Sequence, residues 1–343
     1  MQAVGNIKKS HALTLDEYVA GITSGNRTVL ARAITLIESQ ARAHETQAQE
    51  ILQRILPLTG KAKRVGISGV PGVGKSTFIE ALGCHLIDDG HKVAALAIDP
   101  SSSISGGSIL GDKTRMDRLC QEPNAFIRPS PASGVPGGVA RRTRETMLLC
   151  EAAGFDTILV ESVGVGQAEV ALRSMVDFFL LLLLPGSGDE LQGIKKGIME
   201  VADAILINKA DGETLLAAEQ ARIHQAAALH CLLPATAGWR TEVGLCSART
   251  GAGIEEVWKR IESFYHEFEP KGVIAERRRQ QMLDWLTDLV RDELQRNFYA
   301  NPGVEKALPE VRDAVLQGKM TAPQAAATLL EAGESRKEPK NYD

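Results

Sequence analysis

The segment from Gly69 to Ser76, with the sequence GVPGVGKS, constrains this chain more than any other stretch. It fits the pattern G-x-x-x-x-G-K-[ST] at every fixed position, which is the spacing of a loop that binds phosphate groups. An apolar run at 64–68 precedes it, and a run with helical spacing at 77–82 follows it. The sequence therefore predicts a buried strand, a phosphate-binding loop and a helix in direct succession.

Each fixed position of this loop has a physical role. Glycines let the backbone curl so that its N–H groups converge on a phosphate, and the N-terminus of the next helix adds partial positive charge there. Lys75 would reach the β- and γ-phosphates, and the Ser76 hydroxyl would bind the magnesium ion that bridges them. The alternative is a glycine-rich turn with no ligand. The predicted nucleotide-binding residues here are Gly69, Val70, Pro71, Gly72, Val73, Gly74, Lys75, Ser76 and Thr77.

Composition excludes several other classes of protein. The net charge is −4 and the aromatic content is 4%, so neither a basic patch nor a stacking platform indicates a nucleic-acid partner. The most apolar run, Phe178–Leu184, is far shorter than the ~20 residues of a membrane-spanning helix, and no signal-peptide hydrophobic region is present. The five cysteines form no C-x-x-C pair. They predict the reduced, mostly buried thiols of a cytoplasmic protein. The short apolar run predicts no membrane partner.

Apolar strand-like runs alternate with helical stretches between residues 64 and 268. Because the runs lack in/out alternation, they predict an α/β fold with a mostly parallel sheet flanked by helices, the architecture of a P-loop NTPase G domain. Ligands of such sheets bind at the carboxyl ends of the strands. The predicted strands are 64–68, 92–98, 125–128, 156–160, 178–184, 204–208 and 243–246.

Helical segments flank this region on both sides, beginning with a capping box at Thr14–Glu17. A later helix carries an apolar stripe at positions 283, 286, 290 and 294, which fits packing within the chain and packing against a second copy equally well. The charge runs 141–144 and 276–279 are expected to be solvated helix faces or partner-docking surfaces. The predicted organisation is an N-terminal helical extension at 1–60, a G domain at 61–269, a C-terminal helical region at 270–334 and a flexible tail at 335–343.

The segment Asn208-Lys209-Ala210-Asp211 predicts which base is bound. A carboxylate at 211 can accept hydrogen bonds from the N1–H and exocyclic amine of guanine, whereas adenine has an acceptor at N1 and no amine at C2. Discrimination of this kind can reach about 10⁴-fold. Asn208 would hold the base and the loop, and the stem of Lys209 would cover the base plane. A surface turn is the alternative. Backbone support for the base is predicted from Ser247, Ala248 and Arg249.

Two aspartates are candidates for binding magnesium. The apolar run 93–98 ends in Asp99, and a Gly/Ser-rich segment separates it from Asp112. Carboxylate oxygens near a phosphate loop suit Mg²⁺, and the segment between them suits a switch that orders around the γ-phosphate. Ordinary loop or capping chemistry is the alternative for each aspartate.

A second switch is predicted after the run 157–160, where Glu161 is followed three residues later by Gly164. The Gly164 N–H would donate to the γ-phosphate, and Glu161 stands where G proteins usually have Asp. Gln167 is a candidate for positioning water, but it does not directly follow Gly164, so we expect slow intrinsic hydrolysis. The polar loop 185–196 is either a third switch or a solvated connection. The predicted catalytic residues are Lys75, Glu161 and Gln167, and the predicted metal ligands are Ser76, Asp99, Asp112 and Glu161.

Taken together, the motifs resemble those of the MeaB/ArgK family of P-loop GTPases, relatives of the human MMAA protein, over essentially the whole chain. The resemblance implies a Mg²⁺-dependent GTPase that binds GTP and GDP and acts as a chaperone for adenosylcobalamin-dependent methylmalonyl-CoA mutase. It also implies homodimerisation through the C-terminal helices and a partner-signalling role for the loop 185–196. The motifs that carry it are Gly69–Ser76, Asp99–Ser103, Asp112–Arg115, Glu161–Glu169, Asn208–Asp211 and Ser247–Arg249.

Three other functions remain open from the sequence. A kinase acting on a periplasmic amino-acid-binding protein would need ATP, against which Asp211 argues. A nickel metallochaperone GTPase would carry His-rich tracts or Cys pairs, whereas the seven histidines here are scattered. A nucleotide-gated scaffold that hardly hydrolyses GTP differs from a chaperone GTPase only in its kinetics.

Overall fold

The structure is a computed structural model that describes residues 13–39, 41–98, 116–129, 136–162, 168–186, 196–230 and 232–334. The chain divides into two compact units, with the division after Gln281. The first unit contains the sheet and most of the helices, and the second contains helices alone.

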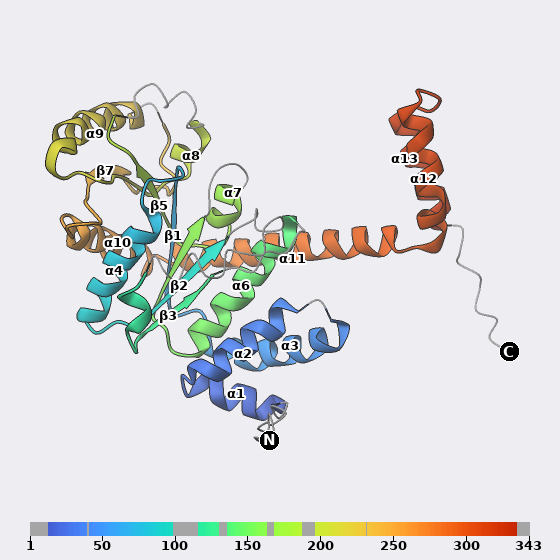
Figure 1. Ribbon diagram of the computed structural model, residues 1–343, viewed down its shortest axis with the longest axis horizontal. Coiled ribbons are helices and arrows are strands. Elements are labelled where there is room, and N and C mark those ends of the chain that lie inside the picture. The colour runs from blue at the N-terminus through green and yellow to red at the C-terminus, as the bar shows by residue number, and fades with distance from the viewer. Residues whose placement is uncertain are drawn as a thin grey trace, which may run out of the picture. The chain divides into compact units, whose positions relative to one another are not determined.

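A seven-stranded sheet with the order β3-β2-β4-β1-β5-β6-β7 forms the centre of the first unit (Figure 1). Every neighbouring pair of strands is parallel, which confirms the predicted fold class. All seven predicted runs form strands. Their bounds are β1 Lys63–Gly69, β2 Val93–Ile98, β3 Ala125–Arg128, β4 Thr157–Ser162, β5 Phe178–Leu183, β6 Ala204–Ile207 and β7 Glu242–Leu245.

Both faces of the sheet are apolar, which explains why the strand sequences lack alternation. In β5, for example, Phe179 and Leu181 belong to one hydrophobic cluster, while Phe178 and Leu180 belong to the other. Successive side chains of a strand point to opposite faces, so a strand covered on both sides must be apolar throughout. The sheet is therefore buried between two layers of helices.

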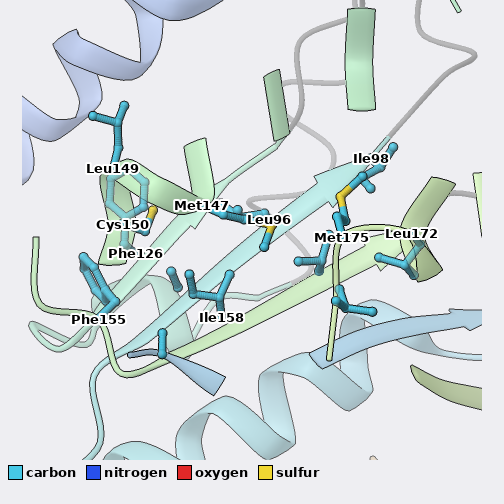
Figure 2. Close-up of a cluster of buried hydrophobic side chains, with 14 of the residues drawn as sticks. Leu96, Ile98, Phe126, Met147, Leu149, Cys150, Phe155, Ile158, Leu172 and Met175 are labelled. Carbon is cyan, nitrogen blue, oxygen red and sulfur yellow. The ribbon is translucent and has the colours of Figure 1, made fainter. Parts of the chain in front are cut away.

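One face of the sheet is covered by α6 (Pro136–Ala152) and by the three N-terminal helices α1 (Leu15–Thr23), α2 (Arg27–Glu38) and α3 (Arg42–Ile55). The capping box at α1 is confirmed: the Glu17 amide donates to Thr14 Oγ1 at 3.3 Å, and the Thr14 amide donates to Glu17 Oε2 at 2.7 Å. Figure 2 shows part of the core beneath these helices, where β2, β3, β4 and α6 meet. The labelled side chains there are Leu96, Ile98, Phe126, Met147, Leu149, Cys150, Phe155, Ile158, Leu172 and Met175.

The other face is covered by α4 (Lys75–Asp88) and α10 (Ile254–Phe268), which pack against each other (Figure 1). Aromatic side chains fill this layer: the rings of Phe178 and Phe264 lie 5.1 Å apart, and those of Trp239 and Phe264 lie 5.2 Å apart, both edge to face. The remaining helices of the first unit are α7 Ala168–Arg173, α8 Lys196–Glu200 and α9 Leu215–Leu229.

The expectation that the run 276–279 is a solvated face is wrong for two of its arginines. Arg278 donates to the fully buried Asp177 through Nε at 2.8 Å and through Nη2 at 2.6 Å, and Arg277 donates to the Thr236 hydroxyl at 2.6 Å. Burial alone would lower the pKa of Arg278, but the hydrogen bonds and charge of Asp177 raise it above its ordinary value. Only Glu276 and Arg279 form an exposed pair.

The run 141–144 is likewise not a simple solvated face. The Arg141 guanidinium pairs with Glu145, whose side chain is 9% exposed. Arg144 donates to the Gln281 carbonyl at 2.9 Å and to the Ser174 hydroxyl at 2.8 Å. The Arg141–Glu145 pair lies within α6, while Arg141 also pairs with Glu45 of α3 at 3.5 Å and Arg144 joins α6 to Ser174 and Gln281.

Helix α11 (Val273–Tyr299) crosses the division after Gln281. The second unit contains its residues from Met282 onward, together with α12 (Pro302–Leu316) and α13 (Ala322–Glu334). Val304, Val311 and Ala325 are buried between α12 and α13. The predicted stripe of α11 lies on a helix and is exposed within this unit, with exposed fractions of 51–66% for Leu283, Leu286, Val290 and Leu294. In the described part of the chain, no helix is both long and apolar enough to cross a bilayer.

Candidate nucleotide-binding site

The predicted phosphate loop follows β1, the strand between β4 and β5 near the middle of the sheet. Two of its glycines are required by the geometry. A Cβ on Gly69 would lie 2.4 Å from the Leu182 carbonyl oxygen, and Gly74 has a φ of 94°, in the left-handed region that favours glycine. Because Gly74 is the N-cap of α4, the loop and the helix N-terminus face one point at the carboxyl edge of the sheet.

Lys75 lies inside this loop and is only 7% exposed. Its ammonium group donates to the carbonyl oxygens of Gly69, at 2.8 Å, and Val70, at 3.2 Å. Burial lowers the pKa of Lys75, and the negative charges of Glu161 and Glu169 partly offset that shift. A phosphate in the loop would give this partly desolvated cation an anionic partner.

Ser76 and Glu161 meet at the first turn of α4. The Ser76 hydroxyl donates to the two carboxylate oxygens of Glu161, at 3.1 and 3.2 Å. The parallel register explains the contact, because Glu161 of β4 lies opposite Ile67 of β1, just before the loop. Strand pairing therefore brings together two oxygen-bearing side chains that are 85 residues apart in the sequence.

The Ser76 hydroxyl and the Glu161 carboxylate could supply some of the oxygen ligands of a hard cation. Hydroxyl and carboxylate oxygens are the ligands that Mg²⁺ prefers, and Mg²⁺ at phosphate sites commonly takes its other ligands from phosphate and water. Within the described ranges, no group of three or more His, Cys, Asp or Glu side chains could hold a metal by itself. The candidates Asp99, Asp112, Gly164 and Gln167 lie outside the described residues, as does most of the loop 185–196.

The segment that we call the base loop, residues 208–214, begins where β6 ends and is attached to the phosphate loop at two points. The side-chain amide of Asn208, which is 1% exposed, donates to the Val73 carbonyl at 2.8 Å. The Lys209 ammonium group donates to the Gly72 carbonyl at 2.8 Å. Two segments more than 130 residues apart are thus joined side by side.

Residues 246–249 brace the base loop from β7. The Ser247 hydroxyl donates to Asp211 Oδ2 at 2.5 Å, and the Ala248 amide donates to Asn208 Oδ1 at 3.1 Å. The Cys246 thiol is buried, which raises its pKa to about 12, so it acts as a packed neutral group. Arg249 is exposed.

The structure thus gathers the described candidates into one site. The phosphate loop, Glu161, the base loop and residues 247–248 lie at the carboxyl ends of β1, β4, β6 and β7, where an open parallel sheet binds its ligands. Their roles toward a ligand remain predictions. One residue of the base loop, Thr214, was not predicted from the sequence, and its contacts are described below.

A model of the family described as "Methylmalonyl Co-A mutase-associated GTPase MeaB" matches residues 30–303. A protein of Caulobacter vibrioides named "Putative GTPase" is 50% identical over 321 residues, which cover 94% of this chain and 98% of the relative. The "Methylmalonic aciduria type A homolog, mitochondrial" of Mus musculus is 44% identical over 332 residues, which cover 94% of this chain and 80% of the relative.

A solved structure described as "Crystal structure of LAO/AO transport system kinase" has a TM-score of 0.75 and 37% sequence identity. The match covers 95% of this chain and 99% of that one. Together with the sheet order and the loop after β1, this likeness establishes the P-loop NTPase fold with terminal helical extensions.

Proposed function

We propose that this chain, which belongs to the MeaB family of methylmalonyl Co-A mutase-associated GTPases, binds GTP and GDP with Mg²⁺ and hydrolyses GTP slowly. The observation that carries the proposal is the attachment of the base loop to the phosphate loop through Asn208 and Lys209. The base and the phosphate chain of a nucleotide are joined through the sugar. A site for it therefore needs the base loop and the phosphate loop held at a fixed distance from each other.

Guanine recognition is assigned to Asp211. One of its carboxylate oxygens accepts from Ser247, and a carboxylate has further acceptor sites for the N1–H and exocyclic amine of guanine. Lys209 would cover the base with its stem while its ammonium group remains on the phosphate loop.

In the hydrolytic step, Lys75 would stabilise negative charge on the phosphates, because its partly desolvated ammonium group lies within the loop. Ser76 and Glu161 would hold Mg²⁺, directly or through water, together with the predicted ligands Asp99 and Asp112. The ion would neutralise charge on the β- and γ-phosphates. Gly164 would donate to the γ-phosphate and Gln167 would orient water, although its place in the sequence favours a slow basal rate.

The client that we propose is adenosylcobalamin-dependent methylmalonyl-CoA mutase, whose cofactor loading or protection the GTPase would gate. The family description and the name of the mouse relative support this choice. We further propose a cytoplasmic homodimer formed through the C-terminal helices, because the apolar stripe of α11 is exposed within its unit.

The name given to the solved relative supports a second candidate, a kinase of an amino-acid transport system. Such a kinase would transfer the γ-phosphate of ATP to a protein. A carboxylate at Asp211 disfavours adenine, since the N1 atom of adenine is an acceptor and would face the carboxylate without a hydrogen bond.

The test is GTP hydrolysis by the purified protein, alone and with the methylmalonyl-CoA mutase of the same cell. The Lys75→Ala variant serves as the control for contaminating GTPases. A slow rate that the mutase accelerates supports the proposal. An unchanged rate without a detectable complex would remove the mutase as client, and labelling of an amino-acid-binding protein from γ-labelled ATP would favour the kinase.

A further inference from the structure

Thr214 closes the base loop from its C-terminal end. Its hydroxyl oxygen lies 2.5 Å from the Lys209 carbonyl oxygen and 2.7 Å from the Asp211 carbonyl oxygen, so its single proton is shared between these two acceptors. The Thr214 amide also donates to the Asp211 carbonyl at 3.1 Å. A single exposed side chain therefore binds the backbone on both sides of Ala210.

This use of the hydroxyl is unusual for the position that Thr214 occupies. Thr214 is the N-cap of α9, where a threonine oxygen ordinarily accepts a hydrogen bond from an amide of the first helical turn. Here the side chain makes no capping hydrogen bond, and the backbone is already helical, with φ −88° and ψ −7°. The hydroxyl is directed back to the base loop, so capping does not explain its geometry.

The backbone that Thr214 holds is unfavourable by itself. Lys209 has a φ of 60°, and no other non-glycine residue in the described ranges has a positive φ. An L side chain in this conformation crowds its own carbonyl oxygen, so other interactions must hold the residue there. The Lys209 carbonyl accepts from Thr214, and the Lys209 ammonium group is held at Gly72.

Asp211 is likewise held from two sides. Its backbone carbonyl accepts from Thr214, and its side chain accepts from Ser247. Although Asp211 is the N-cap of the short 3₁₀ turn Gly212–Thr214, its carboxylate makes no capping hydrogen bond there. The direction of the carboxylate thus depends on Ser247 at its oxygen and on Thr214 at its backbone.

We propose that Thr214 is a positioning residue for base specificity, which sets the direction of the Asp211 carboxylate without contacting the nucleotide. The proposal rests on the proposed function, in which Asp211 recognises guanine. Loss of the hydroxyl would let Lys209 relax and Asp211 turn, and this would weaken the hydrogen bonds to the base while leaving the phosphate loop in place.

The experiment compares Thr214→Val and Thr214→Ser with the native chain. Valine keeps the shape and removes the donor, whereas serine keeps the donor. Thr23→Val is the matched control, because Thr23 is also exposed and donates to two backbone carbonyl oxygens, those of Val19 and Ala20, in a helix of the N-terminal region. Dissociation constants for GDP, IDP and ADP are measured by competition with a fluorescent GDP analogue, or by calorimetry for ligands too weak to compete.

We expect Thr214→Val to weaken GDP binding about three- to tenfold, the range set by one lost hydrogen bond. IDP binding should weaken less, since inosine lacks the exocyclic amine, and ADP binding should not change. Thr214→Ser should keep the native ratio of the GDP and ADP dissociation constants, because serine keeps the donor. Thr23→Val should leave that ratio unaltered.

If Thr214→Val left the ratio of the GDP and ADP dissociation constants unchanged, whether both rose equally or neither rose, the positioning role would be overturned. The guanine preference of the native chain would still stand. A native chain without preference for GDP over ADP would instead overturn the proposed function, and the role of Thr214 with it.

Discussion

Asn208 Nδ2 donates to the backbone carbonyl oxygen of Val73 at 2.8 Å and joins the base loop to the phosphate loop. Because Gly74 lies directly beside this contact, a Cβ there would come within 2.9 Å of Asn208 Nδ2. Gly74, which the phosphate loop needs for its left-handed backbone, thus also leaves room for the Asn208 side chain that joins the two loops. We regard this contact as the centre of the site.

Asn208→Ala tests that contact. The change leaves the Val73 carbonyl and the Ala248 amide without their side-chain partner, so we expect the free energy of unfolding to fall by about 1–3 kcal/mol. GDP binding should weaken about tenfold or more, since the two loops lose their register. Urea unfolding and calorimetric titration measure these effects. Asn297→Ala is the control, because Asn297 is exposed and its side-chain amide donates to Glu293 of the same helix at 3.1 Å. Equal effects of the two changes would contradict the account.

The strands could be predicted from the sequence because each is a buried apolar run, and the phosphate loop because its spacing is nearly invariant among such loops. The partial burial of Arg277 and Arg278 could not be predicted. A local charge run does not reveal Asp177, which lies about a hundred residues away and meets these arginines only after folding. Thr214 was missed for a related reason: its position suggests a helix cap, and only the geometry shows its hydroxyl directed to Lys209.

Arg278 and Arg279 are adjacent, yet we expect their substitutions to differ sharply. Arg278→Ala leaves the fully buried Asp177 without its charge partner, so the free energy of unfolding should fall by about 3–5 kcal/mol. Arg279→Ala removes only an exposed pair with Glu276 and should cost less than about 1 kcal/mol. Urea unfolding of both variants measures the difference, and similar losses would show that the Arg278 pair is not buried in solution.

Glu145 should make stability depend on pH. Burial raises its pKa above the ordinary 4.5, with Arg141 opposing the shift. The folded state therefore holds the proton more tightly, and stability that is present below pH 4.5 is lost as pH rises through the folded pKa. Glu145→Gln mimics the protonated form, so its unfolding free energy relative to the native chain should rise between about pH 4 and pH 7. A difference that does not change with pH would show that Glu145 is not buried in solution.

Magnesium dependence tests the predicted ligand Asp99. Chelation of Mg²⁺ should stop GTP hydrolysis by the native chain, because the ion neutralises charge on the phosphates. Asp99→Ala should shift half-maximal activity to higher Mg²⁺ concentration, about tenfold for the loss of one carboxylate ligand or second-sphere partner. Asp88→Ala is the control, because Asp88 is an exposed carboxylate at the opposite end of α4 from Ser76. If Asp99→Ala kept the native magnesium dependence, Asp99 would not be a ligand of the metal, either directly or through water.

The most direct test of the proposed guanine site is nucleotide selectivity at Asp211. Dissociation constants for GDP, XDP and ADP would be measured for the native chain and for Asp211→Asn. The native carboxylate should prefer GDP by several orders of magnitude, of order 10⁴-fold over ADP. The asparagine amide can donate to the C2 carbonyl oxygen of xanthine, so the variant should lose affinity for GDP and gain it for XDP. An unchanged preference in Asp211→Asn would remove Asp211 from the base pocket and contradict the account.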